Sequence, residues 1–276
     1  MLTDAQLKKL EEKARLLRKD VMEMLYIAQS GHPGGSLSLA DIMSVLYFHD
    51  LNYDVRQPKA LDRDRVILSK GHAAPIWYAT LAEAGFFSTD ELAKLRRTGA
   101  LLQGHPCMHI PGVDLTTGSL GLGLSGGCGM AFAAKMTKRE RVRIYVIIGD
   151  GELGEGQIWE AAMAAGHFGL DNLTAIIDRN RYQNDGATKD ILEVEPLFDR
   201  WRSFGWNTIE IDGHDLIQIE SAFQLGRRTK GKPTMVIANT VKGKGVSYLI
   251  DRPELHYAAP NLEQKEAALA DLGYGG

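Results

Sequence analysis

The sequence predicts an α/β protein in which helices flank a mostly parallel central sheet. Short apolar runs alternate along the chain with segments of helical periodicity, as expected when strands and helices follow one another. Most of these runs lack polar alternation, which is typical of parallel strands that are covered on both faces. The 276 residues contain no internal repeat and no low-complexity linker, so we expect a single domain over residues 1–276.

The predicted elements begin with an amphipathic helix over residues 4–29, where charged residues alternate with spaced leucines. The glycines and proline of SGHPGGS (30–36) break the chain before a second predicted helix, LADIMSVLYFHDL (39–51). The five predicted strands are RVILS (65–69), RIYVIIGD (143–150), NLTAIID (172–178), TIEID (208–212) and TMVIANT (234–240). The later predicted helices are EGQIWEAAMAAGHFG (155–169), LIQIESAFQLGRRT (216–229) and, within a short C-terminal tail (251–276), NLEQKEAALADL (261–272).

The composition argues against several classes of function. A net charge of −3 without a basic stripe gives no reason to expect a nucleic-acid partner. No apolar run approaches the ~20 residues that span a membrane, and the charged N-terminus is unlike a secretory signal. Cys107 and Cys128 lack CxxC spacing, so we expect neither a zinc site nor a disulfide framework, and we expect a cytoplasmic location.

A candidate binding site follows the second predicted strand, which runs directly into Gly149-Asp150-Gly151 just before a helix. In an open α/β sheet, ligands bind beyond the carboxyl ends of the strands. The flanking glycines let the backbone approach a ligand closely, and the following helix offers N–H groups to an anion. For the GDG motif alone, a simple turn is the structural alternative.

A second polar strand end lies about thirty residues further on, at Asp178-Arg179-Asn180. Asp150 and Asn180 are therefore expected to meet at one edge of the sheet as two oxygen ligands, with a backbone carbonyl as a third. Such ligands suit Mg²⁺, which usually shares its coordination with phosphate oxygens and water. An Asn at a strand end is often only a cap or turn residue, but the pair at this spacing indicates a site for a metal and a diphosphate.

These residues carry a resemblance to a known family. GDG followed about thirty residues later by Asn resembles the thiamine diphosphate signature, and GDGELGEG resembles its transketolase version. The resemblance implies a three-layer thiamine diphosphate-binding fold. It also implies that Asp150, Asn180 and the carbonyl of Tyr182 ligate Mg²⁺ (or Ca²⁺ or Mn²⁺), and that Gly151 donates its N–H to the diphosphate.

Three histidine motifs extend the resemblance. SGHPGGSLSLAD, LSKGHAAP and QGHP are similar to transketolase motifs that place His32 against the substrate, His72 on the cofactor's phosphates and His105 near the donor hydroxyls. All three histidines lie in Gly- or Pro-containing loops, which favours binding or proton transfer over a core role. A solvated or backbone-bonded loop histidine is the alternative for each.

A glycine-rich loop extends the resemblance further. TTGSLGLGLS matches the loop whose Gly118, Ser119 and Leu120 pack around the cofactor. Residues 121–126 of the same region also fit the dinucleotide fingerprint GxGxxG. No convincing buried strand precedes them, however, so we do not expect a nicotinamide site.

The last matching residues lie after the GDG motif and near the C-terminus. TVKGKG and His256 resemble the segment whose lysine, here Lys244, and histidine reach the diphosphate and the substrate. A solvated turn is the alternative for VKGKG. In the family, a glutamate after GDG, here Glu155, takes part in contacts between paired cofactor sites; a helix-start carboxylate favoured by the helix dipole fits equally well.

The resemblance implies a transketolase that transfers a two-carbon ketol unit from a ketose phosphate to an aldose phosphate. In this scheme His32, His105 and His256 face the reaction. The alternatives are half of another thiamine diphosphate enzyme, such as 1-deoxyxylulose-5-phosphate synthase or a 2-oxo acid dehydrogenase, and a non-catalytic cofactor-binding module. His32-Pro33 and His105-Pro106 match transketolase better than they match those rival enzymes.

In full-length transketolases the glutamate that activates the cofactor lies in a second, pyrimidine-binding domain, and the acceptor-phosphate arginines also lie outside the matched region. We therefore expect the partner to be a complementary, pyrimidine-binding C-terminal subunit, in an α₂β₂ assembly. Two departures from the family pattern affect the substrate. Asn184 follows the glutamine of the loop near the thiazolium, and Tyr257 replaces the usual glycine beside the late histidine, near the substrate entrance. These departures make a different sugar specificity possible.

Overall fold

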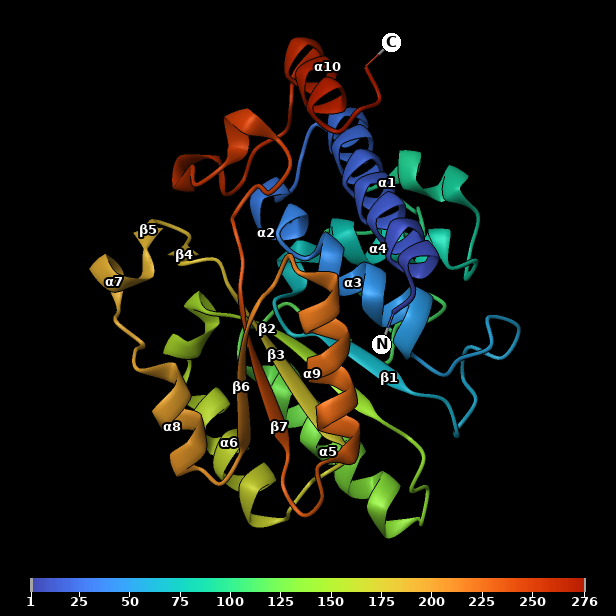
Figure 1. The fold of residues 1–276 in the computed structure, drawn as a ribbon. Helices are drawn as coiled ribbons and strands as arrows, with labels where there is room; N and C mark the ends of the chain where they lie inside the picture. The colour runs from blue at the N-terminus through green and yellow to red at the C-terminus, as the bar shows by residue number, and fades with distance from the viewer. Residues whose placement is uncertain (1, 276) are drawn as a thin grey trace.

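A five-stranded parallel sheet forms the centre of the computed structural model, which describes residues 2–275 (Figure 1). The strand order is β1-β2-β3-β7-β6. The strands are β1 Arg65–Leu68, β2 Ile144–Gly149, β3 Leu173–Arg179, β6 Asn207–Asp212 and β7 Thr234–Asn239. All five were predicted from apolar runs, and every ladder between them is parallel. The α/β fold with a mostly parallel sheet is confirmed.

Helices cover both faces of this sheet and give the molecule three layers (Figure 1). One outer layer contains α1 (Asp4–Ala28), α3 (Ala40–Val45), α4 (Ala74–Glu83) and α9 (Leu216–Arg228). The other contains α5 (Leu122–Met136), α6 (Gly156–His167) and α8 (Leu197–Ser203). The remaining helices are α2 (Pro33–Leu37), α7 (Thr188–Ile191) and α10 (Leu262–Asp271), the last of which packs on α1.

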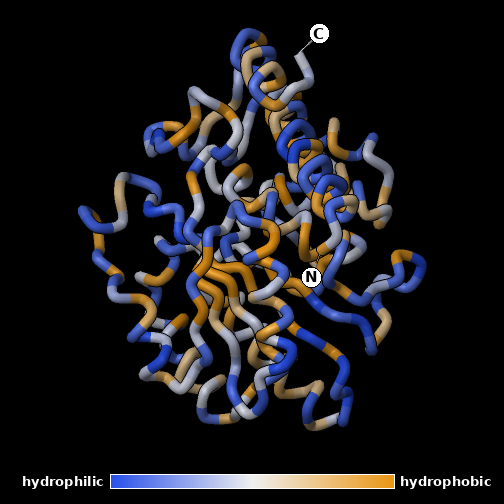
Figure 2. The backbone as a smooth tube through the Cα atoms, in the orientation of Figure 1, coloured by the Kyte–Doolittle hydropathy of each residue, from blue (hydrophilic) through white to orange (hydrophobic). Residues whose placement is uncertain are grey.

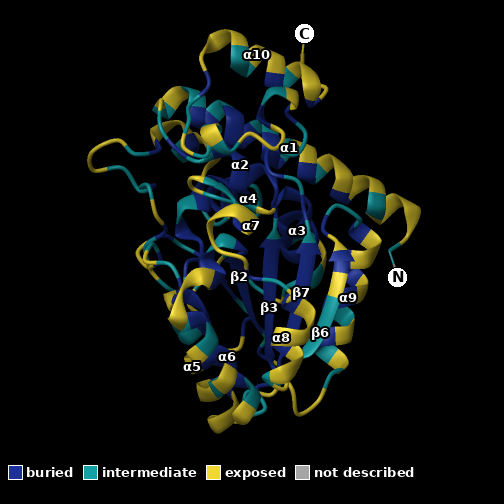
Figure 3. Ribbon diagram, turned by 90° about the vertical axis from the view of Figure 1, so that its left-hand side faces the viewer, coloured by how far each residue is buried: buried dark blue, intermediate teal, exposed yellow. Residues whose placement is uncertain are grey.

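The sheet carries two separate hydrophobic cores because successive side chains of a strand point to opposite faces. In β1, Val66 and Leu68 join the core beneath α1 and α4, whereas Ile67 joins the core beneath α5 and α6. Figure 2 shows the strands as the most apolar part of the chain, and Figure 3 shows the central ones buried. Both faces of the central strands are therefore covered, whereas the edge strand β6 is only partly buried.

The structure differs from the sequence prediction around α2 and α3. The expected break at residues 30–36 contains the short helix α2, which starts at Pro33, a residue whose fixed φ suits the first helical position. The helix expected over residues 39–51 is divided into α3 and a π-helical turn, Leu46–Asp50. The first helix ends close to its predicted boundary, because Gln29 adopts the left-handed conformation that terminates helices.

A small antiparallel hairpin was also not predicted. Its strands, β4 (Tyr182–Gln183) and β5 (Gly186–Ala187), follow β3 directly. The hairpin brings the residues after Asn180 back beside the end of β2. Within residues 2–275, no helix has the length and apolar character needed to cross a bilayer.

Candidate active site

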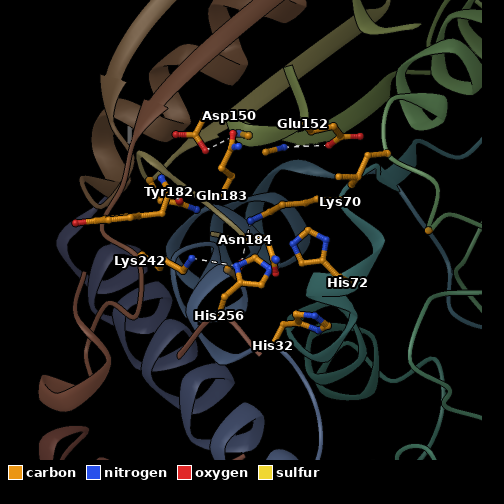
Figure 4. Close-up of a pocket in the computed structure, with 16 residues that line it drawn as sticks. His32, Lys70, His72, Asp150, Glu152, Tyr182, Gln183, Asn184, Lys242 and His256 are labelled. Atoms are coloured by element: carbon orange, nitrogen blue, oxygen red, sulfur yellow. Dashed lines mark hydrogen bonds between the residues drawn. The ribbon is translucent and has the colours of Figure 1, made fainter. Parts of the chain in front are cut away.

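A cavity of about 370 Å³ opens at the carboxyl ends of the strands (Figure 4). Four strand ends contribute to its wall: Lys70 and His72 follow β1, Asp150 follows β2, Asn180 follows β3 and Lys242 follows β7. His32 enters from the start of α2, and His256 comes from the segment after Lys242. The parallel order of the sheet therefore brings together residues that lie far apart in the sequence.

Asp150 and Asn180 lie together at this edge, as their spacing predicted. The Asp150 carboxylate accepts hydrogen bonds from the backbone N–H groups of Gly151, at 2.9 Å, and Arg181, at 2.5 Å. The Asn180 side-chain oxygen accepts from the N–H of Tyr182 at 3.2 Å, and its amide group donates to Asp178 at 3.0 Å. These bonds hold two oxygen-bearing side chains, and the loop that contains Tyr182, against one wall of the cavity.

The charge of Asp150 fits a cation in the cavity. The residue is only 2% exposed, and no side-chain cation within residues 2–275 forms an ion pair with it. Burial, followed by the nearby Asp178 charge, raises the pKa of Asp150 to about 7. A buried carboxylate, an amide oxygen and backbone carbonyls are the hard oxygen ligands that Mg²⁺ prefers. The residues present therefore fit a divalent metal.

A buried ion pair lies beneath this wall and was not singled out in the sequence. The Lys70 ammonium contacts the Asp178 carboxylate and donates to the Gly35 carbonyl at 2.9 Å. Burial opposes the ionisation of Asp178, but Lys70 and the hydroxyls of Ser38 and Thr240 hold its pKa below the usual value. Lysine placed directly after an apolar strand, as in LSKGH, is the signal that would have identified Lys70.

Lys242, and not Lys244, lines the cavity. Lys242 is 1% exposed, and its alkyl chain runs so close to Gly34 that an added Cβ there would lie 2.9 Å from Lys242 Cε. Burial, together with the charge of Lys70, lowers the pKa of Lys242 to about 8. The backbone N–H of Lys244 closes a turn onto Val241, which directs the chain away after the first lysine.

Three histidines gather on the opposite wall (Figure 4). The ring centroid of His32 lies 5.1 Å from that of His72 and 5.3 Å from that of His256. His256 Nδ1 is 3.0 Å from the Lys242 ammonium, and His32 Nδ1 is buried without a hydrogen-bond partner. An unpartnered buried nitrogen in a cavity wall indicates a position for a polar ligand atom.

All three histidines are neutral at physiological pH. Burial, followed by the repulsion that a protonated His256 would exert and the positive charge of Arg96, lowers the pKa of His32 to about 3. Burial and Lys242 lower the pKa of His256 to about 4, and burial holds the pKa of His72 well below its usual value. Neutral imidazoles can both donate and accept hydrogen bonds, which suits the hydroxyl groups of a sugar.

Two further segments lie at the edge of the cavity, the glycine-rich loop with Gly118 and the loop with His105. Gly118 and Leu120 line the cavity, whereas Ser119 is exposed outside it. His105 is also exposed and does not line the cavity, but an added Cβ at Gly118 would be only 3.3 Å from its ring. Burial and the Arg96 charge lower the pKa of His105. His105 therefore lies at the rim and not in the cavity wall.

The two glutamates after GDG occupy different environments. Glu152 lines the cavity and is buried, and its carboxylate accepts hydrogen bonds from Ser69 and from the N–H groups of Gly121, at 2.8 Å, and Gly149, at 3.1 Å. It thus joins the ends of β1 and β2 to the start of α5. Glu155, selected from the sequence, is exposed. The position of Glu152 directly after GDG is the only sequence signal that pointed to it.

Gly151 has no room for a side chain, because an added Cβ would lie 2.6 Å from Gln183 Cβ. In this structure its N–H donates to Asp150, as described above. The residues that fit GxGxxG start helix α5 at Leu122, and no strand directly precedes them among the described residues. The context of a dinucleotide fingerprint is therefore missing, as expected.

Comparison with known proteins agrees with this geometry. Residues 8–275 match the family described as transketolase, thiamine diphosphate binding domain. The chain is 43% identical to one subunit of the apulose-4-phosphate transketolase of Phocaeicola vulgatus, covering 97% of this chain and 95% of that protein. It is 45% identical to the 6-deoxy-6-sulfo-D-fructose transketolase subunit SqwG of a Clostridium species, covering 95% of this chain and 96% of that protein.

The solved structures extend the comparison to longer chains. Transketolase from Campylobacter jejuni superposes with a TM-score of 0.91 at 33% identity, covering 97% of this chain and 43% of that one. This chain therefore spans about two fifths of the length of that solved transketolase.

The parallel sheet and the cavity at its strand ends thus define a thiamine diphosphate-binding domain. The chain belongs to the transketolase family, as its motifs predicted, and it matches the N-terminal, cofactor-binding part of that family. Along nearly its whole length it corresponds to relatives that are named as separate transketolase subunits.

Proposed function

We propose that this chain binds thiamine diphosphate through Mg²⁺ and forms the diphosphate half of a split transketolase active site. The observation that carries the proposal is the buried carboxylate of Asp150, which forms no ion pair within residues 2–275 and lines the same cavity as Asn180. Asp150, Asn180 and the carbonyl of Tyr182 would hold the metal. His72, Lys242 and the loop from Gly118 to Leu120 would surround the cofactor.

When bound, thiamine diphosphate would supply nucleophilic chemistry toward a ketose carbonyl. This chain's own residues bind and orient. Lys242 lies where it would neutralise phosphate charge, with its ammonium 3.0 Å from His256. The neutral His32 and His256 would donate to, and accept from, the oxygens of the sugar. His105 at the rim would contact the sugar further out.

The proposed reaction is the transfer of a two-carbon unit from a ketose phosphate to an aldose phosphate. The relatives named as transketolase subunits support it, because they match this chain almost end to end. A complementary chain would bind the pyrimidine ring of the cofactor, and we propose an α₂β₂ assembly of the two chains in the cytoplasm. An assay that offers pyruvate in place of the ketose phosphate separates this reaction from the other thiamine-dependent ones.

The test is isothermal titration of the chain with thiamine diphosphate, with and without Mg²⁺, alone and with the complementary chain present. We expect metal-dependent binding that Asp150→Ala abolishes, because the variant loses the only carboxylate in the proposed ligand set. Asp62→Ala is the matched control, since Asp62 lies on the surface with its side chain 86% exposed. Binding that persists in Asp150→Ala, or that ignores Mg²⁺, would contradict the proposal.

A further inference from the structure

Tyr257 stands beside His32 at the outer side of the cavity. The two ring centroids are 5.0 Å apart in an edge-to-face arrangement. The Tyr257 hydroxyl lies 2.7 Å from Ser30 Oγ, and the N–H of Ala258 donates to the Gly31 carbonyl at 3.0 Å. The segment after Lys242 is thus folded back onto the loop that precedes α2, and it carries the tyrosine with it.

Arg96 lies against the same ring, with its guanidinium carbon 5.8 Å from the Tyr257 centroid. Its side chain runs along Gly104, where an added Cβ would be 3.0 Å from Arg96 Cζ, immediately before His105. The phenol is therefore held at its hydroxyl by Ser30 and along its ring by His32 and Arg96. A tyrosine fixed in this way has a defined position at the rim.

The contacts of Tyr257 are with the rim and not with either hydrophobic core. The side chain is 56% exposed and belongs to neither core cluster. It does not line the cavity itself, although its neighbours His32 and His256 do. A ligand that fills the cavity and extends outward past His32 meets this ring next.

We propose that Tyr257 is a specificity-determining residue that limits how far a sugar chain can extend outward from His32. This inference rests on the proposed transketolase function. The reacting carbons must lie at the cofactor, inside the cavity, so the rest of the sugar runs past His32 toward the rim. A rigid ring there discriminates against longer chains by steric exclusion, which is a common route to specificity.

The experiment uses the complex with the complementary chain and two acceptors of equal charge, D-glyceraldehyde 3-phosphate and D-ribose 5-phosphate. The readout is the ratio of kcat/KM for the five-carbon acceptor to kcat/KM for the three-carbon acceptor. Tyr257→Ala removes the ring and is expected to raise this ratio about tenfold, within the range that steric pockets achieve. Tyr257→Phe keeps the ring, and Ser30→Ala removes the hydroxyl's partner, so both are expected to change the ratio less than about twofold.

Tyr257→Trp provides the opposite change, because a larger ring should lower the ratio, and it keeps the test valid if Tyr257→Ala folds poorly. An unchanged ratio in both the Ala and Trp variants overturns the inference. An equal change in Tyr257→Phe also overturns it, since the selection would then come from the hydroxyl. Loss of Mg²⁺-dependent thiamine diphosphate binding by the wild-type complex, measured in the titration above, contradicts the proposed function instead, and this separates the two failures.

Discussion

The charged groups around the cavity differ in how they are balanced, and neither Asp150 nor Glu152 forms an ion pair within residues 2–275. The Lys70 ammonium is paired with Asp178, and Lys242 has a lowered pKa, close to the point at which it loses its charge. Within residues 2–275, the hydrogen bonds to the Asp150 carboxylate come from backbone N–H groups. Removing one partner of a buried ion pair leaves the other charge unpaired, which is costly. The Lys70–Asp178 pair therefore keeps a lysine at the cavity wall with its charge balanced.

Another buried carboxylate, Asp20 in α1, gives a prediction of pH-dependent stability. Burial, followed by the charge of Glu83, raises the pKa of Asp20 to about 7, and its Oδ2 has no hydrogen-bond partner. The pKa of Asp20 is higher in the folded protein than in the unfolded chain. The stabilising contribution of its protonated form is therefore fully present below about pH 4 and is lost as the pH rises through 7.

Asp20→Asn keeps the shape of the side chain without the titration. We expect the difference in unfolding free energy between the variant and wild type to shift in favour of the variant by on the order of 2 kcal/mol when the pH rises from 5 to 8. One pKa unit corresponds to about 1.4 kcal/mol. Urea denaturation of both proteins at the two pH values measures this difference. A gap between the two proteins that does not change with pH would show that Asp20 is ionised in the folded protein throughout.

At the scale of elements, helix α5 lies close to the end of strand β1, and a glycine in α5 marks the point of contact. An added Cβ at Gly123 would lie 2.6 Å from the Ser69 Cα, a backbone atom that cannot move aside cheaply. An added Cβ at Gly129, in the same helix, meets nothing within 4 Å. Gly129 is therefore a control in the same helix, at a position with room for a methyl group.

Gly123→Ala is therefore expected to destabilise the protein by about 1–3 kcal/mol through overpacking. Gly129→Ala should stabilise it by roughly 0.5–1 kcal/mol, since alanine favours the helix. Denaturant midpoints of both variants measure the effects. If both variants were stabilised equally, α5 would not be in close contact with the end of β1 at Gly123.

The five strands of the central sheet were predictable, because apolar runs mark strands that are covered on both faces, but helices α5 and α8 were not predicted. The strand order was not predictable, since periodicity does not say which strands pair. The sequence of β6 does contain one indication of an edge position, because Thr208 and Glu210 introduce polar residues into this strand. Helix α4 was missed because almost all of its residues are buried, which removes the helical periodicity.

Among the site residues, sequence reasoning identified most of those that line the cavity, since motifs fix loops at strand ends. It selected Lys244, whereas Lys242 lines the cavity and packs against Gly34, which is distant in the sequence. It did not single out Glu152, which lines the cavity. The burial of Glu152 comes from the loops that donate to its carboxylate, and these contacts exist only after folding.

For the whole molecule, the position of the cavity couples ligand binding to global stability. The cavity takes residues from the ends of β1, β2, β3 and β7, and these strands carry both hydrophobic cores. A ligand that contacts all four strand ends binds the folded chain and not the unfolded one. It should therefore stabilise the entire fold by mass action.

At a concentration one hundred times its dissociation constant, such a ligand adds about 2.7 kcal/mol. For a chain of this size, thiamine diphosphate with Mg²⁺ is thus expected to raise the Tm by roughly 5–10 °C. Removing the metal with EDTA should abolish the shift, because Asp150 then lacks a cation through which to hold the diphosphate. Differential scanning calorimetry measures this, with Asp150→Ala as the variant that should not respond and Asp62→Ala as the one that should. A shift that survives EDTA would mean that Lys242 and His72 hold the diphosphate without a metal. A shift that appears only with the complementary chain present would mean that the cavity binds cofactor only once it is closed by its partner.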